Sequence, residues 1–487
     1  MDCFSSLPPE INVKILFDLK ITSNIASLLA ASPTMLAHYR HSKQRIQRTH
    51  LQNELYGSLL QDALAVANFP SEKALETDSK RALHHIEKWK QARFPDPFLH
   101  RDSATIERLN RLYTRLSKYI EDYITKATSI FPPRAYLSIP TPSSNLDHLQ
   151  FRGQSIGIKI LKINALGDDE KRRLFQAFIR YELVSKIHYL IESRELRVID
   201  RLVSSSFRNL QYWEVEALRC VYFYMQDLYG AIFAHLGDSW LPDIPLTLVT
   251  ETDGMIQDEG LQFPDNVWFC SHRYMSDTEI SRTTANVILP DELAFLGFDC
   301  ITTLLHSPRD KRGCPFQLEK WLCEIPKRLR YKHWAGGLKM YSLFMNSIFK
   351  VRPQNPWDDS SEICRMLRLN NGISLEHVHP DAAPHAELLL NICRQRGWVF
   401  FDDACHYYDG NILRHFPTHK QLERQWQNPT IPFSICRYSR EHDPHRSQTW
   451  QVDHDEWGLY RDLIANLRKK IGGLILLVLE LKSCITP

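Results

Sequence analysis

Apolar residues recur every three or four positions over about five helical turns between Ile106 and Tyr123. The stripe consists of Ile106, Leu109, Leu112, Tyr113, Leu116, Tyr119, Ile120 and Tyr123. This spacing places the whole stripe on one face of an α-helix, and such a face must be buried against another element. The pattern therefore predicts a long amphipathic helix inside a larger helical body.

Other segments show the same helical spacing, and residues that end helices separate them. We expect further helices in residues 51–66, 72–92, 168–201, 212–236, 316–350, 383–396 and 455–482. Residues 131–150 carry too many prolines for a helix interior and predict a connection. Residues 240–315 contain single prolines and the Asp253-Gly254 pair, which predict an irregular middle section that allows short strands. The expected fold class is mainly α.

The segment from Leu7 to Ile46 predicts a bundle of three short helices. Pro8 and Pro9 suit the entry to the first helix, and residues 22–24 (Thr-Ser-Asn) offer N-cap side chains to the second. Ser32 and Pro33 end that helix and start the third. The apolar positions of the bundle are Ile11, Ile15, Leu16, Leu19, Ile25, Leu28, Leu29, Met35, Leu36, Tyr39 and Ile46.

This ordered series resembles the F-box family. The matching stretches are Leu7-Pro8-Pro9-Glu10-Ile11, Ile15-Leu16-Phe17-Asp18-Leu19, Ile25-Ala26-Ser27-Leu28-Leu29 and Ala31-Ser32-Pro33. The variant looks most like the F-boxes of long fungal proteins of unknown substrate. It departs from the family in two ways, because the third helix lacks the Trp that many F-boxes carry and Ala31 replaces the usual Val. Tyr39 is a candidate for the aromatic role. The alternative is that these are the first three helices of an ordinary all-helical domain.

The resemblance implies a three-helix module that binds a Skp-type adaptor. The residues implied in adaptor binding are Leu7, Pro8, Ile11, Ile15, Leu16, Leu19 and Leu28. A bundle of about forty residues cannot bury all of its apolar side chains, so an exposed apolar patch is expected there. The implied function is that of a substrate receptor in a cullin-based ubiquitin ligase. Such a chain needs no cofactor and catalyses nothing itself, because ubiquitin transfer belongs to its partner enzymes.

The expected organisation is an F-box in residues 1–50, a helical extension in 51–130, a proline-rich connection in 131–150 and a C-terminal body in 151–487. The body would recruit the protein substrate. It shows no repeat of the leucine-rich or propeller kind, for which a regular period is expected. Neither the fold of the body nor the substrate follows from the sequence.

Charge argues against a nucleic-acid partner. The 60 basic and 57 acidic residues leave a net charge of only +3, whereas nucleic-acid binders concentrate a basic excess in one patch. The densest basic runs are short, at residues 43–45, 171–173 and 327–330. We interpret each of them as a solvated helix face rather than a track for phosphates.

Cysteine usage and targeting signals favour the cytoplasm or nucleus. The 11 cysteines form no CxxC pair and no disulfide framework, and no glycosylation sequon occurs. The N-terminus does not resemble a signal peptide. The apolar run at residues 471–479 is about half as long as the ~20 residues needed to span a bilayer, so we expect a buried helix there and no membrane partner.

Two other functions stay open. A scaffold could use the F-box for assembly outside a ligase, and a metal-dependent enzyme could use a His/Asp cluster. The candidate ligands are His377, His379, Asp381 and His385, followed by clusters at residues 402–406 and 442–455. Prolines place most of these histidines in loops without the fixed spacing of metal sites, so we expect surface or capping roles and no metal. Residues 396–402 are expected to pack in a core rather than face a substrate.

Overall fold

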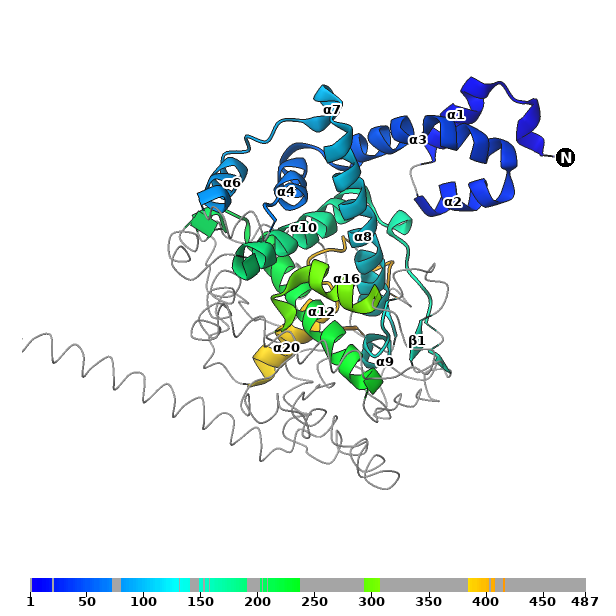
Figure 1. Cartoon of the computed structure of the whole chain (residues 1–487). Coiled ribbons are helices and arrows are strands. Elements are labelled where there is room, and N and C mark those ends of the chain that lie inside the picture. The colour runs from blue at the N-terminus through cyan, green and yellow to red at the C-terminus, as the bar shows by residue number, and fades with distance from the viewer. Residues whose placement is uncertain are drawn as a thin grey trace, which may run out of the picture.

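The computed structural model describes residues 2–19, 22–71, 80–130, 132–140, 149–151, 154–156, 158–190, 202–203, 205–207, 209–236, 293–306, 384–402, 404–407 and 415–416. These residues form a mainly helical protein, which confirms the predicted fold class (Figure 1). No helix within these ranges is both long and apolar enough to cross a membrane. The helices expected over 316–350 and 455–482 lie outside the described residues.

The N-terminal part consists of the short 3-10 turn η1 (Cys3–Ser6) and the helices α1 (Pro9–Asp18), α2 (Thr22–Ala31) and α3 (Pro33–Glu54). α1 and α2 both pack against α3. Their common core contains Leu16, Ile25, Met35 and Ile46. Three helices are therefore present where the sequence predicts them, but the third continues past Ile46 to Glu54.

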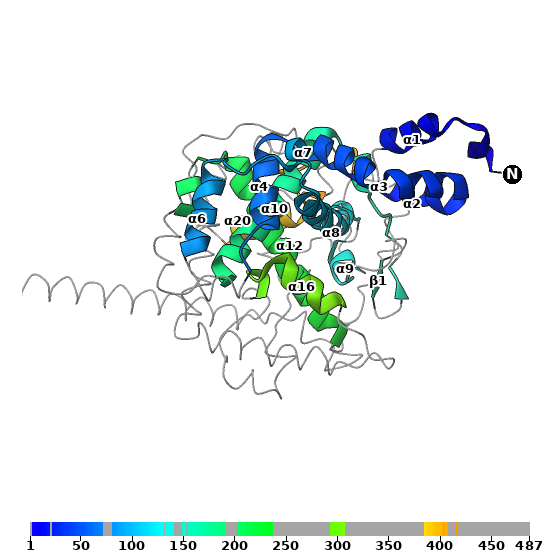
Figure 2. The ribbon, with the colours of Figure 1, turned by 45° about the horizontal axis from the view of Figure 1, so that its top comes forward.

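A second, larger core begins on the same helix α3. Leu51 and Leu55 are buried in this second core, whereas Ile46 belongs to the N-terminal one. α3 thus runs from α1 and α2 to the body around α4 (Gly57–Ala67) and α8 (Ser103–Thr128), as Figures 1 and 2 show from two sides. The expected boundary at residue 50 falls inside one continuous helix.

The remaining elements build the body. They are α6 (Lys80–Lys90), α7 (Pro97–His100), α9 (Pro132–Tyr136), the two-residue antiparallel strands β1 (Gln150–Phe151) and β2 (Gln154–Ser155), the turn η2 (Ile163–Ala165), α10 (Asp168–Leu190), α12 (Tyr212–Leu236), α16 (Gly297–His306) and α20 (Pro384–Gln395). α10 is central, because α4, α8, α12 and α16 all pack against it.

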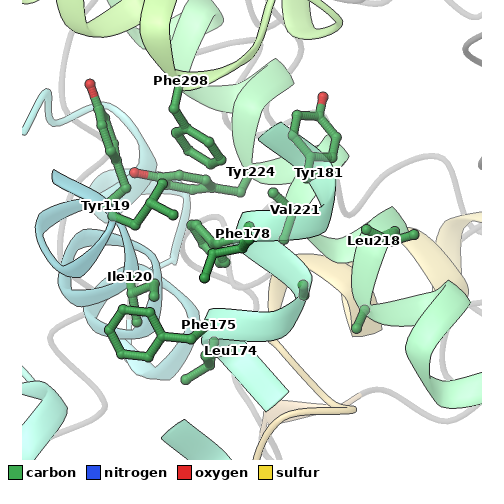
Figure 3. Packing of buried hydrophobic residues seen from close by; sticks show 14 of the residues in the cluster. Tyr119, Ile120, Leu174, Phe175, Phe178, Tyr181, Leu218, Val221, Tyr224 and Phe298 are labelled. Carbon is green, nitrogen blue, oxygen red and sulfur yellow. The ribbon is translucent and has the colours of Figure 1, made fainter. Parts of the chain in front are cut away.

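α8 is the long amphipathic helix that the sequence predicts. Asp102 caps its start by accepting a hydrogen bond from Thr105 N at 3.1 Å, and the apolar stripe is buried along the helix. Figure 3 shows Tyr119 of α8 beside Phe298 of α16, with their ring centroids 5.0 Å apart. Phe298 also stacks on Phe178 of α10 at 5.2 Å. Aromatic contacts therefore join three helices that are distant in sequence.

The connection predicted for 131–150 packs against the body instead of separating two units. Its residues 135–138 are buried, and Tyr136 Oη donates a hydrogen bond to Gln395 O at 2.6 Å. One continuous hydrophobic core includes residues from both sides of this connection, from Leu51 to Phe416. The helical extension and the described part of the C-terminal body therefore fold together, because the faces of α8 and α10 cover each other.

The prediction of an irregular middle section is wrong at α16. Its Phe298, Ile301 and Leu304 have helical spacing and are buried. The backbone N–H groups at the start of α16 have no partner within the helix, and a residue distant in sequence binds them. Glu182 of α10 accepts hydrogen bonds from Phe298 N at 2.5 Å and Asp299 N at 3.2 Å. Glu182 therefore takes the place of a local N-cap side chain, which is the signal that would have marked this helix in the sequence. Most of 240–315 lies outside the described residues.

A buried ion pair joins α20 to α12. Arg394 Nε lies 3.0 Å from Glu216 Oε2, and Arg219 also pairs with Glu216. Burial alone would raise the pKa of Glu216, but the two guanidinium groups outweigh it and lower this pKa to about 2. The carboxylate is therefore charged at neutral pH although it is fully buried.

Replacing Arg394 with Met should lower the free energy of unfolding by about 3 kcal/mol, because it leaves a buried carboxylate short of one partner. The matched control is Arg111→Met on α8, since Arg111 and Glu107 form an exposed pair at 3.8 Å that should contribute about 0.5 kcal/mol or less. Urea denaturation measures both variants. Equal effects would contradict a stabilising role for the buried pair.

The same denaturation experiment has an expected pH dependence. The folded pKa of Glu216 lies below its usual value, so its contribution is complete above about pH 4.5 and is lost as the pH falls toward about 2. The difference in stability between wild type and Arg394→Met should therefore shrink over this range.

Gly397 ends α20 in a conformation that suits glycine. Its φ is +70°, Gly397 N donates to Arg394 O at 3.1 Å, and Trp398 N donates to Cys393 O at 3.2 Å. This is the hydrogen-bond pattern of a Schellman cap. The chain then turns into the core, where residues 398–401 are fully buried. The prediction that this run packs in a core is confirmed.

Gly397→Ala should destabilise the protein by about 3 kcal/mol, from left-handed strain plus overpacking. An added Cβ would lie 3.0 Å from the Phe401 ring and 3.2 Å from Tyr123 Oη. Gly57→Ala is the control, because Gly57 has φ +59° but nothing within 4 Å of its added Cβ, and it should cost about 1 kcal/mol. Thermal or urea unfolding measures both variants. If they lose the same stability, crowding of the new Cβ against Phe401 and Tyr123 does not contribute to the loss in Gly397→Ala.

Candidate interaction surface

The first residues of the chain are held against the start of α3. Asp2 Oδ1 accepts a hydrogen bond from Phe4 N at 3.0 Å. Its Oδ2 accepts from Ser32 Oγ at 2.7 Å and from Thr34 N at 3.0 Å. Ser32 Oγ in turn accepts from Met35 N. Asp2 therefore caps two elements at once, η1 beside it and α3, which lies 30 residues further along the chain.

Electrostatics favour the charged form of Asp2. The hydroxyl of Ser32, followed by the backbone N–H of Thr34, holds the pKa of the Asp2 carboxyl well below its usual range. Asn12 of α1 adds a second attachment, because its Nδ2 donates to Phe4 O at 3.1 Å. These contacts fix the path of the chain between η1 and α1, where Leu7 and Pro8 lie.

The predicted adaptor-binding residues fall into three groups. Leu7, Pro8 and Ile11 are exposed. Ile15, Leu19 and Leu28 are partly buried and pack against the N-terminal core with one side.

Leu16 differs from the other six. Its side chain is fully buried in the N-terminal core, because its position on α1 faces α3. It therefore offers no surface to a partner in this structure. Leu16 supports the surface indirectly, by holding α1 in place.

Leu7 and Ile11 are two of the exposed large hydrophobic side chains of the described chain. Among the described residues the exposed large hydrophobic side chains are Leu7 (37%), Ile11 (44%), Tyr56 (51%) and Leu99 (74%). Tyr56 is partly covered by the Arg172 guanidinium 5.3 Å from its ring centroid. Leu7 and Pro8 lie directly before α1, and Ile11 lies in its first turn. We call these three exposed apolar residues the α1 patch.

Tyr39, the candidate for the aromatic position of the third helix, is partly buried against the N-terminal core. Burial raises the pKa of its hydroxyl, although a hydrogen bond with Gln47 opposes the shift. Arg45 lies over the ring of Phe17 at 5.3 Å from its centroid. The third helix therefore contributes aromatic and cation–π contacts to the module without a Trp.

Only some of the candidate metal ligands belong to the described residues. His377, His379, Asp381 and the cluster at 442–455 lie outside the described residues, and His385 is described only as part of α20. In the cluster at 402–406, Asp402 pairs with Arg173 at 2.5 Å and His406 Nε2 lies 3.0 Å from Glu170 Oε2. The described residues contain no group of three or more His, Cys, Asp or Glu side chains that could hold a metal ion.

Comparison with known proteins gives no match: no family model, no curated protein and no solved structure resembles this chain significantly.

Sequence reasoning found the α1 patch but missed the residues that position it. Asp2, Asn12 and Ser32 act through contacts between segments, and only the Ser32-Pro33 N-cap leaves a local signal. Nothing near Asp2 in the sequence indicates that its partner is Ser32.

Removing the Asp2 side chain should loosen the start of α3. In Asp2→Ala, the amides of Thr34 and Met35 should exchange with solvent faster than in wild type, because the Asp2–Ser32 cap is lost. Hydrogen exchange with mass-spectrometric or NMR detection measures this. Asp18→Ala, at the exposed end of α1, is the control and should leave both amides unchanged.

The effect of Asp2→Ala should also depend on pH. Because the folded pKa of Asp2 is lowered, its contribution is present above its unfolded pKa of about 4 and is lost as the pH falls below that value. As the pH falls below about 4, the ratio of variant to wild-type exchange rates should therefore approach one. A ratio that grows on acidification would contradict the capping role.

Proposed function

We propose that this chain is a substrate receptor of a cullin-based ubiquitin ligase, which binds a Skp-type adaptor through its N-terminal helices. The observation that carries the proposal is the α1 patch. Leu7, Pro8 and Ile11 lie exposed on a small helical unit whose core is separate from that of the body. An apolar patch on such a unit is typical of a protein interface.

The arrangement of the two cores supports the same role. Among the described residues, the N-terminal core contains four buried apolar side chains, and a small core leaves more of its apolar surface outside than a large core does. The body has the extensive core and is the part available for a protein substrate. In this role the chain carries out no chemistry, and it needs neither a metal nor another cofactor.

The α1 patch should account for most of the adaptor affinity. Burying one such side chain contributes roughly 1.5–3 kcal/mol, so Leu7→Ala/Ile11→Ala should weaken adaptor binding at least about 30-fold. Both side chains are already exposed, so the double variant should unfold at nearly the same urea concentration as wild type. Isothermal titration calorimetry with a Skp-type adaptor measures the change.

Two controls separate binding from folding. Lys14→Ala changes an exposed residue of the same helix and should leave adaptor binding within about twofold of wild type. Leu16→Ala removes a core side chain and should destabilise the N-terminal helices by about 2–5 kcal/mol. If the double variant binds as tightly as wild type, the F-box assignment is wrong. If it unfolds the N-terminal helices, Leu7 and Ile11 serve the fold instead.

A scaffold outside a ligase is the second candidate, favoured by the same α1 patch because adaptor binding does not require a cullin. Affinity purification of the full chain from cells, read by mass spectrometry, distinguishes the two. The ligase proposal expects both adaptor and cullin, in amounts that fall together in Leu7→Ala/Ile11→Ala. Adaptor without cullin would support the scaffold.

A further inference from the structure

Helix α3 carries a cluster of positive charges in its middle, between Arg40 and Arg48. Between Pro33 and Asn53 it contains Arg40, Lys43, Arg45 and Arg48 together with three histidines, and its first acidic residue is Glu54. Arg40, Gln44 and Arg48 recur every four positions, which aligns them on one face of the helix. That face is opposite Met35 and Ile46, which point into the N-terminal core.

These cations differ from those of the body. In the body, Arg115 pairs with Glu182, Arg180 with Asp62 and Arg394 with Glu216, at 2.8–3.3 Å. Arg40, Lys43 and Arg48 form no ion pair with any described residue of the chain. Arg40 and Lys43 are exposed, and Arg48 is half-exposed.

The spacing of the charges is unfavourable for the helix itself. Arg40 and Lys43 are three positions apart, as are Arg45 and Arg48, and like charges at this spacing destabilise a helix. No acidic side chain stands four positions from any of them to offset the repulsion. Within the described residues no ion pair compensates this repulsion, so negative charge supplied by a partner would stabilise the helix.

We propose that the row of α3 formed by Arg40, Gln44 and Arg48, with Lys43 beside it, docks an acidic segment of a protein partner. Arg40 and Arg48 are eight residues apart, or about 12 Å along the helix. Carboxylates on one side of an extended segment repeat about every 6.7 Å, so alternate carboxylates match both arginines and leave one beside the amide of Gln44. Lys43 lies on one flank of the row.

A protein segment fits this row better than a nucleic acid does. Three cations along about 12 Å are fewer than the phosphate contacts of a typical nucleic-acid interface. Sequence-tolerant nucleic-acid binding also uses exposed aromatic side chains for stacking. The aromatic side chains of the N-terminal helices, Phe4, Phe17 and Tyr39, pack against the N-terminal core. The exposed Tyr56 lies beyond α3, and its ring is already in contact with the Arg172 guanidinium. The proposal does not depend on adaptor binding, because the row lies on the opposite side of α3 from that core.

The test measures binding of a fluorescein-labelled peptide of about ten residues, alternating Glu and Ser, to the full chain by fluorescence anisotropy. Arg40→Gln/Lys43→Gln/Arg48→Gln should weaken binding at least about tenfold. The matched control removes the same number of charges from exposed positions of the body, as Lys88→Gln/Lys90→Gln/Arg93→Gln, and should change binding less than about twofold.

Three outcomes would overturn the proposal. They are no measurable peptide binding to wild type, equal losses in the two triple variants, and tighter binding of a single-stranded oligonucleotide of the same length that the α3 variant abolishes. A readout of folding accompanies them. The α3 variant should melt at the same temperature as wild type or higher, because it removes like-charge repulsion, whereas a structural role for these side chains predicts a lower melting temperature.

Discussion

Ile46 and Leu51 are five residues apart on one helix, yet their side chains belong to two different hydrophobic cores. The peptide groups between them form uninterrupted helical hydrogen bonds, so α3 is the element that joins the N-terminal helices to the body. The rest of the arrangement depends on this helix. It supplies Met35 and Ile46 to the small core, Leu51 to the large one, and its intervening turns remain open to solvent on one face.

The two cores are stabilised in different ways. In the part of the chain that the structure describes, the small one contains four buried apolar side chains, and the Asp2–Ser32 contact holds the N-terminus at the start of α3. The large one combines aromatic packing with charges that are buried in pairs, such as Glu216 with Arg394. Burying such a pair costs desolvation energy that its attraction only partly offsets, but losing one partner costs more. The positive charges of α3 have no such partners within the described chain.

Much of this fold follows from periodicity alone. The spacing of apolar residues predicts α8, because this helix buries one continuous stripe. α12 and α20 also lie within one residue of their expected ranges, although their described side chains are buried on nearly all sides. Contacts between distant segments leave no such signal. Glu182 accepts a hydrogen bond from the first turn of α16, 116 residues further along the chain. Arg394 donates to Glu216, which precedes it by 178 residues.

The residues of the candidate surface are also predictable from the sequence only in part. The Leu-Pro opening and the helical spacing indicate Leu7, Pro8 and Ile11, which are exposed, but spacing alone does not separate Ile11 from the buried Leu16. That distinction depends on which side of α1 faces α3. Asp2, which fixes the preceding turn, is a positioning residue that only the structure reveals.

The central claim is that the N-terminal helices are a docking unit for a Skp-type adaptor. Hydrogen exchange of the full wild-type chain, with and without about 10 μM adaptor, tests it most directly. Docking of the adaptor at these helices should give new protection in η1 and α1, including Leu7–Leu19, and leave exchange in α8 and α10 unchanged. The absence of a complex, or protection confined to the body, would contradict it.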